Sequence, residues 1–85
     1  MKVTHTFEIE ARCPSISGHV DHYECILTLD RFMKVEDIRP KLERILAEPI
    51  FQEPLAEAIL STLGATSVRL EGPHPGGFRT IVEID

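Results

Sequence analysis

The sequence predicts an α+β fold in which an antiparallel four-stranded sheet carries two helices on one face. Hydrophobic and polar residues alternate in two segments near the N-terminus and in two near the C-terminus, and a period of two is typical of half-buried strands. Between these pairs the hydrophobic period lengthens to that of a helix, over two segments. The predicted order is therefore ββααββ, within one domain that spans residues 1–85.

The first two predicted strands cover residues 2–11 and 20–30, and a polar loop at 12–19 joins them as an antiparallel pair. One face of the first strand carries the less polar residues: Val3, His5, Phe7, Ile9 and Ala11. One face of the second strand carries Tyr23, Cys25, Leu27 and Leu29, and the other carries His22, Glu24, Ile26 and Thr28. We expect the face of the second strand that carries Tyr23, Cys25, Leu27 and Leu29 to lie in the core.

The first predicted helix covers about 38–47, because four apolar residues recur there at helical spacing: Ile38, Leu42, Ile45 and Leu46. Asp37 is the expected N-cap, which would place Pro40 in the first turn, where its missing N–H leaves no bond unmade. The second helix covers about 53–63, with Pro54 in its first turn and Gly64 just past its end. Strands at about 66–71 and 78–84 follow, joined by a tight connection at 72–77.

Composition excludes several classes of function. The net charge is −5 and the nine Lys and Arg residues form no block, so we expect no nucleic-acid partner. No apolar run is long enough to cross a membrane and no signal peptide is visible, which predicts a cytoplasmic protein. The two cysteines are expected to be free thiols. A sheet with helices on one face leaves its other face and both edge strands open, so we expect a ring-like homo-oligomer.

The stretch from Cys13 to Glu24 holds most of the candidate chemistry, since it places a thiol, two imidazoles and two carboxylates at the start of one strand. Cys13 is a candidate nucleophile, with Asp21, His19 or His22 as its acid or base. The alternative is that Cys13 is a small apolar residue in a turn. Cys25 lies inside a strand and is expected in the core, and His5 and His74 are expected at the surface or in turns.

The same stretch contains four possible zinc ligands: Cys13, His19, His22 and Cys25. The spacing matches no common finger or ribbon, and alternation puts His22 and Cys25 on opposite faces of their strand. The sequence therefore gives no defined metal site.

The order of elements resembles that of the tunnelling-fold superfamily, whose members complete barrels by oligomerisation and bind purine- or pterin-like rings at subunit interfaces. Cys13-Pro14, Gly18 and Asp21 resemble the motif of the 7-cyano-7-deazaguanine reductases of queuosine biosynthesis, the QueF-like branch. This resemblance implies that Cys13 attacks a nitrile and that Asp21 acts as the acid. Phe51-Gln52-Glu53 is similar to that branch's phenylalanine-histidine-glutamate, which implies that Glu53 anchors the ring.

The reductases also carry a motif for the nicotinamide cofactor, and the segment Val35 to Lys41 occupies its place. Only Glu36 and Lys41 match it, and Ile38 stands where the central lysine is found. NADPH is therefore not expected as a cofactor. We expect either a reaction at the nitrile without reduction or a different ring substrate.

The same stretch also resembles the 6-pyruvoyl-tetrahydropterin synthases. His19 and Tyr23 match that branch, whereas Ala11 and Asp21 stand in place of two metal-binding histidines. Glu71 is similar to its pterin-anchoring glutamate. Three hypotheses remain open: an enzyme that acts on a deazapurine- or pterin-like heterocycle, a non-catalytic ring-binding or assembly protein, and an unrelated α+β interaction domain. As alternatives to ligand binding, Glu53 is a carboxylate at the start of a helix and Glu71 is an exposed charge at the end of a strand.

Overall fold

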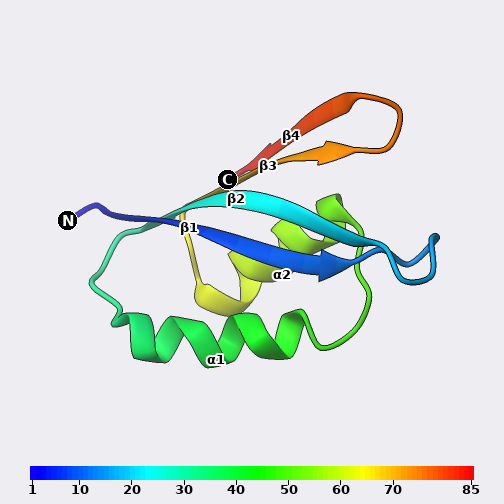
Figure 1. Cartoon of the computed structure of the whole chain (residues 1–85). Helices are drawn as coiled ribbons and strands as arrows, with labels where there is room; N and C mark the ends of the chain where they lie inside the picture. Colours follow the sequence, from blue (N-terminus) through cyan, green and yellow to red (C-terminus); the bar gives the residue numbers. More distant parts are fainter.

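The computed structural model describes residues 1–85 and has the predicted ββααββ order. Its elements are β1 (Val3–Arg12), β2 (Val20–Leu29), α1 (Val35–Ile45), α2 (Gln52–Leu63), β3 (Ser67–His74) and β4 (Phe78–Ile84) (Figure 1). The four strands form one sheet in the order β1-β2-β3-β4, and every neighbouring pair is antiparallel. The predicted α+β fold class is confirmed.

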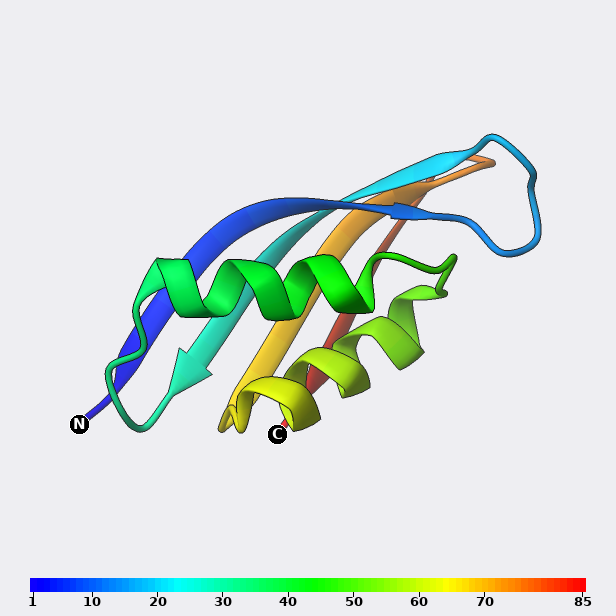
Figure 2. The same ribbon diagram turned by 90° about the horizontal axis from the view of Figure 1, so that it is seen from below.

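Both helices lie on the same face of the sheet (Figure 2), which we call the inner face; the opposite face is the outer face. The predicted alternation is confirmed in β2, where Tyr23, Cys25, Leu27 and Leu29 are almost fully buried on the inner face. Leu55, Ile59 and Leu63 of α2 and Val68 and Leu70 of β3 belong to the same hydrophobic cluster. Burial of this apolar surface is the main favourable contribution to folding.

The start of α1 differs from the prediction. The helix begins at Val35 with Lys34 as its N-cap, so Asp37 is not the capping residue. The carbonyl of Lys34 accepts hydrogen bonds from the amides of Asp37 and Ile38, at 2.9 and 3.1 Å. Pro40 therefore lies inside the helix and not in its first turn. Pro40 is exposed, so the carbonyl that its missing N–H leaves free can be hydrated.

The third strand is longer than predicted, because it continues through Gly72 and Pro73 to His74. Beyond Glu71 this strand pairs with β4 alone, since the β2–β3 ladder ends at Glu24 and Glu71. A strand with one open side tolerates a proline. The second helix ends as predicted, with Gly64 in the left-handed conformation at φ 59°.

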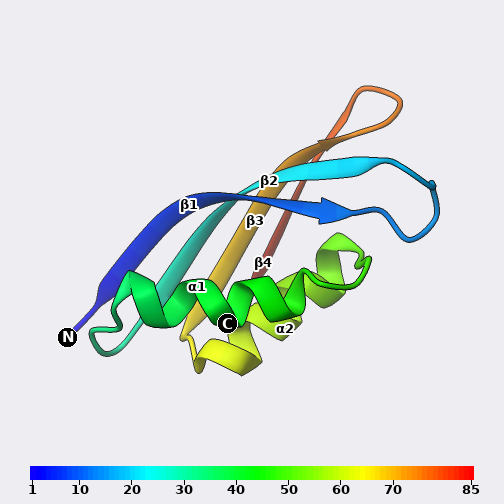
Figure 3. The same ribbon diagram turned by 60° about the horizontal axis from the view of Figure 1, so that its bottom comes forward.

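Three connections lie toward the end of the sheet that is away from the N-terminus: the 13–19 loop, the link between α1 and α2, and the β3–β4 turn (Figure 3). The predicted candidate residues Cys13, His19 and Asp21 belong to this end. Neither helix is long and apolar enough to cross a membrane.

Candidate functional site

Backbone hydrogen bonds fix the loop that carries Cys13. The amide of Cys13 donates to the carbonyl of His19 at 3.0 Å, and the amide of His19 donates to the carbonyl of Ile16 at 3.1 Å. The amide of Ile50 donates to the carbonyl of Arg12 at 3.1 Å, which ties the α1–α2 link to the end of β1. Cys13 and His19 are therefore held opposite each other as a continuation of the β1–β2 hairpin.

Asp21 is the one carboxylate in the buried set, with an exposed fraction of 4%. Its place in β2 puts it on the inner face, one alternation before Tyr23. Nε2 of His19 lies 3.1 Å from Oδ1 of Asp21, so the imidazole and the carboxylate share a hydrogen bond. A buried carboxylate needs such a partner, because an unpaired charge in the interior is costly. The structure thus brings together two of the candidate residues, His19 and Asp21.

Cys13 is partly buried and free, and Cys25 is buried and free. Sγ of Cys13 lies 3.3 Å from Oγ of Ser15, and this hydrogen bond, with one from the Ser15 backbone, lowers the pKa of the Cys13 thiol. The negative charge of Asp21 opposes the effect. Because the thiolate is the nucleophilic form, Cys13 is the better placed of the two cysteines for covalent chemistry.

The interior raises the pKa values of the neighbouring residues in β2. Burial raises the pKa of Cys25 to about 12, which keeps this thiol neutral and unreactive in the core. Burial and the charge of Asp21 also raise the pKa of Tyr23, whose hydroxyl oxygen is buried without a hydrogen-bond partner. The prediction that Cys25 is a core residue is confirmed.

A second imidazole approaches Asp21 from the β3–β4 hairpin. Nδ1 of His74 lies 3.9 Å from Oδ1 of Asp21, and Nε2 of His74 lies 2.7 Å from Oε1 of Gln52. Gln52 is buried at the first turn of α2, and its Nε2 donates to the carbonyls of Leu70 and Thr80 at 3.1 and 3.0 Å. The cluster therefore combines residues from the loop, β2, α2 and β3.

The sequence reasoning missed this part of the site, since it treated His74 as a surface or turn residue. In the structure the side chain of His74 is 28% exposed and lies at the end of β3. Extending the alternation from Val68 and Leu70 through Gly72 would have placed His74 on the inner face beside Asp21. The signal was present, but the Gly-Pro pair had suggested that the strand ends earlier.

His22 lies on the outer face, because it follows Asp21 in β2. Its side chain is 66% exposed, and Nδ1 lies 3.4 Å from a carboxylate oxygen of Glu10. The structure therefore does not bring His22 together with Asp21 within one chain. The possible zinc ligands Cys13, His19, His22 and Cys25 do not fit a metal ion either, since they are divided between the loop, the outer face and the core, and no cluster of three His, Cys, Asp or Glu side chains is arranged to hold one.

The two carboxylates predicted to anchor a ring lie in different surroundings. Glu53 is exposed in the first turn of α2, next to Gln52. Glu71 lies on the outer face with a side chain that is 20% exposed, and its oxygens contact Arg79 Nε at 2.6 Å and Arg69 at 3.0 Å. The hydrogen bond from Arg79 lowers the pKa of Glu71. Glu71 is thus already paired, whereas Glu53 is open to a ligand.

The surface has several shallow hollows. One of about 450 Å³ lies along the 13–19 loop and includes Cys13, Ser15 and His19 in its lining. Another of about 530 Å³ lies on the outer face and includes His22, Glu71 and Arg79 in its lining. The two groups of candidate residues are therefore separated by the sheet.

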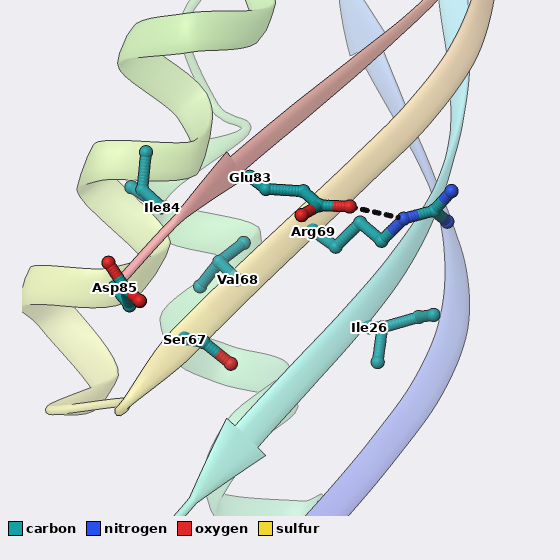
Figure 4. A pocket seen from close by; sticks show the side chains of 7 residues that line it. All are labelled: Ile26, Ser67, Val68, Arg69, Glu83, Ile84 and Asp85. Atoms are coloured by element: carbon teal, nitrogen blue, oxygen red, sulfur yellow. Dashed lines mark hydrogen bonds and ion pairs between the residues drawn. The ribbon is translucent and has the colours of Figure 1, made fainter.

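A third hollow, of about 340 Å³, lies beside the start of β3 and the end of β4 (Figure 4). An ion pair between Arg69 and Glu83 at 3.0 Å crosses it. Its lining contains no thiol or imidazole; the seven residues are Ile26, Ser67, Val68, Arg69, Glu83, Ile84 and Asp85. It offers no nucleophile of the kind that the sequence predicted.

The place predicted for a cofactor lysine is apolar. Ile38 of α1 is 4% exposed and belongs to the hydrophobic core, so this position presents no charged group to a nicotinamide cofactor. Glu36, which matches the reductase motif, is exposed in the first turn of α1.

Neither a protein-family model nor a curated protein matches the sequence. Among solved structures, the fold is similar to that of the archaeosine synthase QueF-Like in its apo form, with a TM-score of 0.72 and 19% sequence identity. The similarity covers 96% of this chain and 91% of that chain. At this level of identity the likeness shows the fold alone: the chain shares the ββααββ architecture of that structure.

Proposed function

We propose that the chain is a subunit of a homo-oligomer that binds a purine- or deazapurine-like heterocycle and uses Cys13 to attack an electrophilic carbon of the ligand. One observation carries the proposal. The thiol whose pKa is lowered, Cys13, lies in the same loop as His19, and His19 pairs with the buried Asp21 at the start of β2. A nucleophile beside a positioned acid is the arrangement that covalent catalysis requires.

The step fits a nitrile. The Cys13 thiolate forms a bond to the nitrile carbon, one π bond of the nitrile breaks, and the nitrogen takes a proton from the carboxylic acid form of Asp21. The product is a covalent thioimide, and no electrons are lost or gained from outside. Because the nicotinamide motif is incomplete and Ile38 is buried, the proposal contains no reduction.

The ring is proposed to contact Glu53. A carboxylate can accept two N–H donors from a guanidine-like edge, and each charge-assisted hydrogen bond contributes about 1.5–3 kcal/mol. Glu53 is free to make these bonds, whereas Glu71 already accepts from Arg79 and Arg69. The archaeosine synthase with the similar fold supports a deazapurine in place of a pterin as the ligand.

Intact-mass spectrometry tests the proposal. The protein is incubated with 7-cyano-7-deazaguanine beside a Cys13→Ala variant, and circular dichroism shows that both are folded. We expect the wild type alone to gain the mass of the ligand. If the folded wild type gains no mass but binds the compound reversibly, a non-catalytic ring-binding protein is the better description; if it neither binds nor reacts, the ligand class is wrong.

A further inference from the structure

The amide group of Gln52 has a fixed orientation. Its nitrogen carries two protons, and these are directed to the carbonyls of Leu70 and Thr80 at 3.1 and 3.0 Å. A reversed amide would place Oε1 against two carbonyl oxygens, which are acceptors only. Oε1 is therefore the atom that faces Nε2 of His74 at 2.7 Å. Since Oε1 can only accept, Nε2 of His74 must carry a proton.

This contact determines what His74 presents to Asp21. A neutral imidazole has one protonated nitrogen, so a proton on Nε2 leaves Nδ1 as the nitrogen that gains or loses a proton. Nδ1 lies 3.9 Å from Oδ1 of Asp21, the same oxygen that contacts His19 at 3.1 Å. The other titratable group near His74 is Tyr23, whose ring centre is 6.0 Å away and which remains neutral because burial raises its pKa.

We propose that His74, oriented by Gln52, is a positioning residue that supplies a proton to Asp21 from Nδ1. This inference rests on the proposed function and adds the route by which Asp21 is protonated. In its imidazolium form His74 carries a proton on both ring nitrogens. As Asp21 gives its proton to the nitrile nitrogen, the Nδ1–H bond of His74 breaks, that proton passes to Oδ1 of Asp21, and a neutral imidazole protonated at Nε2 remains. The separation of 3.9 Å must shorten by about 1 Å, as proton-transfer contacts often do when a substrate closes the site.

Two rates distinguish this role from a structural one. Addition of Cys13 to 7-cyano-7-deazaguanine needs a proton donor, whereas alkylation of Cys13 by iodoacetamide needs only the thiolate. In the His74→Asn variant we expect the first rate to fall about tenfold or more and the second to stay within about twofold.

His5→Asn is the matched control. His5 lies on β1 opposite Leu27, away from Asp21, and its Nε2 has no hydrogen-bond partner to lose. Both of its rates should equal those of the wild type. An equal fall of both rates in His74→Asn would show a structural role and overturn the inference, and so would an unchanged rate of nitrile addition. A wild type that forms no adduct would instead refute the proposed function itself.

Nitrogen-15 NMR of the imidazole rings tests the orientation without any substitution. At a pH where His74 is neutral, we expect its proton on Nε2. A neutral ring protonated at Nδ1 would show that Gln52 does not orient His74, and it would overturn the inference even if Cys13 forms the adduct.

Discussion

Gly72 lies so close to the ring of Tyr23 that no side chain fits between them. A Cβ atom at position 72 would lie 2.6 Å from Cδ1 of Tyr23 and 2.4 Å from the backbone oxygen of His22. Backbone atoms cannot move aside as the end of a side chain can, so even a methyl group must push β3 away from β2. This close contact explains why a glycine stands in the middle of a strand.

The Gly72→Ala substitution should therefore destabilise the protein by about 2–3 kcal/mol, a large part of the stability of a small domain. Urea unfolding followed by circular dichroism measures the change. Ser67→Ala, at the start of the same strand, is the control and should stay within about 0.5 kcal/mol. An equal stability of Gly72→Ala and wild type would mean that β3 does not approach Tyr23 as described.

The two cysteines should differ sharply in reactivity. Cys13 is accessible and its pKa is lowered by Ser15, so its alkylation rate should reach half its maximum at a pH below 9, the ordinary thiol value. Cys25 is buried with a pKa of about 12 and should react only after unfolding. Iodoacetamide labelling followed by peptide mass spectrometry measures both rates across pH.

The hydroxyl of Ser15 lowers the pKa of Cys13, and a substitution can remove it. In Ser15→Ala the side-chain hydrogen bond to Sγ is lost, so the midpoint of Cys13 alkylation should move to higher pH. Ser17→Ala, two residues further along the loop, should leave the midpoint where it is. If the Ser15 and Ser17 variants behave alike, the hydroxyl of Ser15 does not stabilise the thiolate.

The buried thiol also has a consequence for stability. The pKa of the Cys25 thiol is higher in the folded protein than in the unfolded chain. The contribution of this thiol to the free energy of unfolding is therefore complete below about pH 9 and is lost as the pH rises toward about 12. Cys25→Ala should remove this part of the loss of stability at alkaline pH. Urea unfolding at pH 8 and pH 11 compares the two proteins, and an identical decline in both would contradict the assignment.

The sequence predicted the fold well because alternation and helical spacing are local signals. Ile9, Tyr23 and Leu27 lie on the expected face, and Gly64 ends α2. The start of α1 was predicted too late, since Asp37 and Pro40 resemble the beginning of a helix and the structure uses Lys34 as the cap. Local preferences were overruled there by the backbone bonds of the first turn.

The site could be predicted only where it follows from one strand. His19 comes directly before β2 and is two residues from Asp21, so alternation continued back from the strand puts them on the same side. Gln52 and His74 meet across 22 residues of sequence, and their contact depends on how α2 packs beside the end of β3. No pattern within a single segment reveals such a pair, and this is why the second imidazole beside Asp21 was missed.

Substitutions of the two candidate carboxylates, Glu53 and Glu71, should have different effects on ligand affinity. Glu53→Gln should weaken the binding of 7-cyano-7-deazaguanine to Cys13→Ala by at least about tenfold, because a charge-assisted acceptor is lost. Glu71→Gln in the same background should have little effect, since Glu71 is committed to Arg79 and Arg69. Isothermal titration calorimetry measures both affinities. The reverse order would favour a ligand site on the outer face, around Glu71.

The unpaired edge strands of the sheet predict that several copies of the chain associate. Strands β1 and β4 each have a neighbour on one side only. Beside β1 an apolar hollow of about 580 Å³ runs between the strand and α1, and Ile81 on β4 is 48% exposed. Unpaired strand edges with apolar neighbours associate in water. Light scattering should therefore give the mass of several subunits at micromolar concentration.

Lysines on both edges should disrupt this assembly. Thr6 on β1 and Ile81 on β4 have exposed side chains, so Thr6→Lys with Ile81→Lys changes the edges without filling the core. Like charges repel where two edges meet, so the double variant should have a lower mass in light scattering than the wild type. Lysines at two exposed helix positions, Thr62→Lys with Ser61→Lys, form the control and should keep the wild-type mass. A wild type that is monomeric would refute both the oligomer and any ligand site that needs a second subunit.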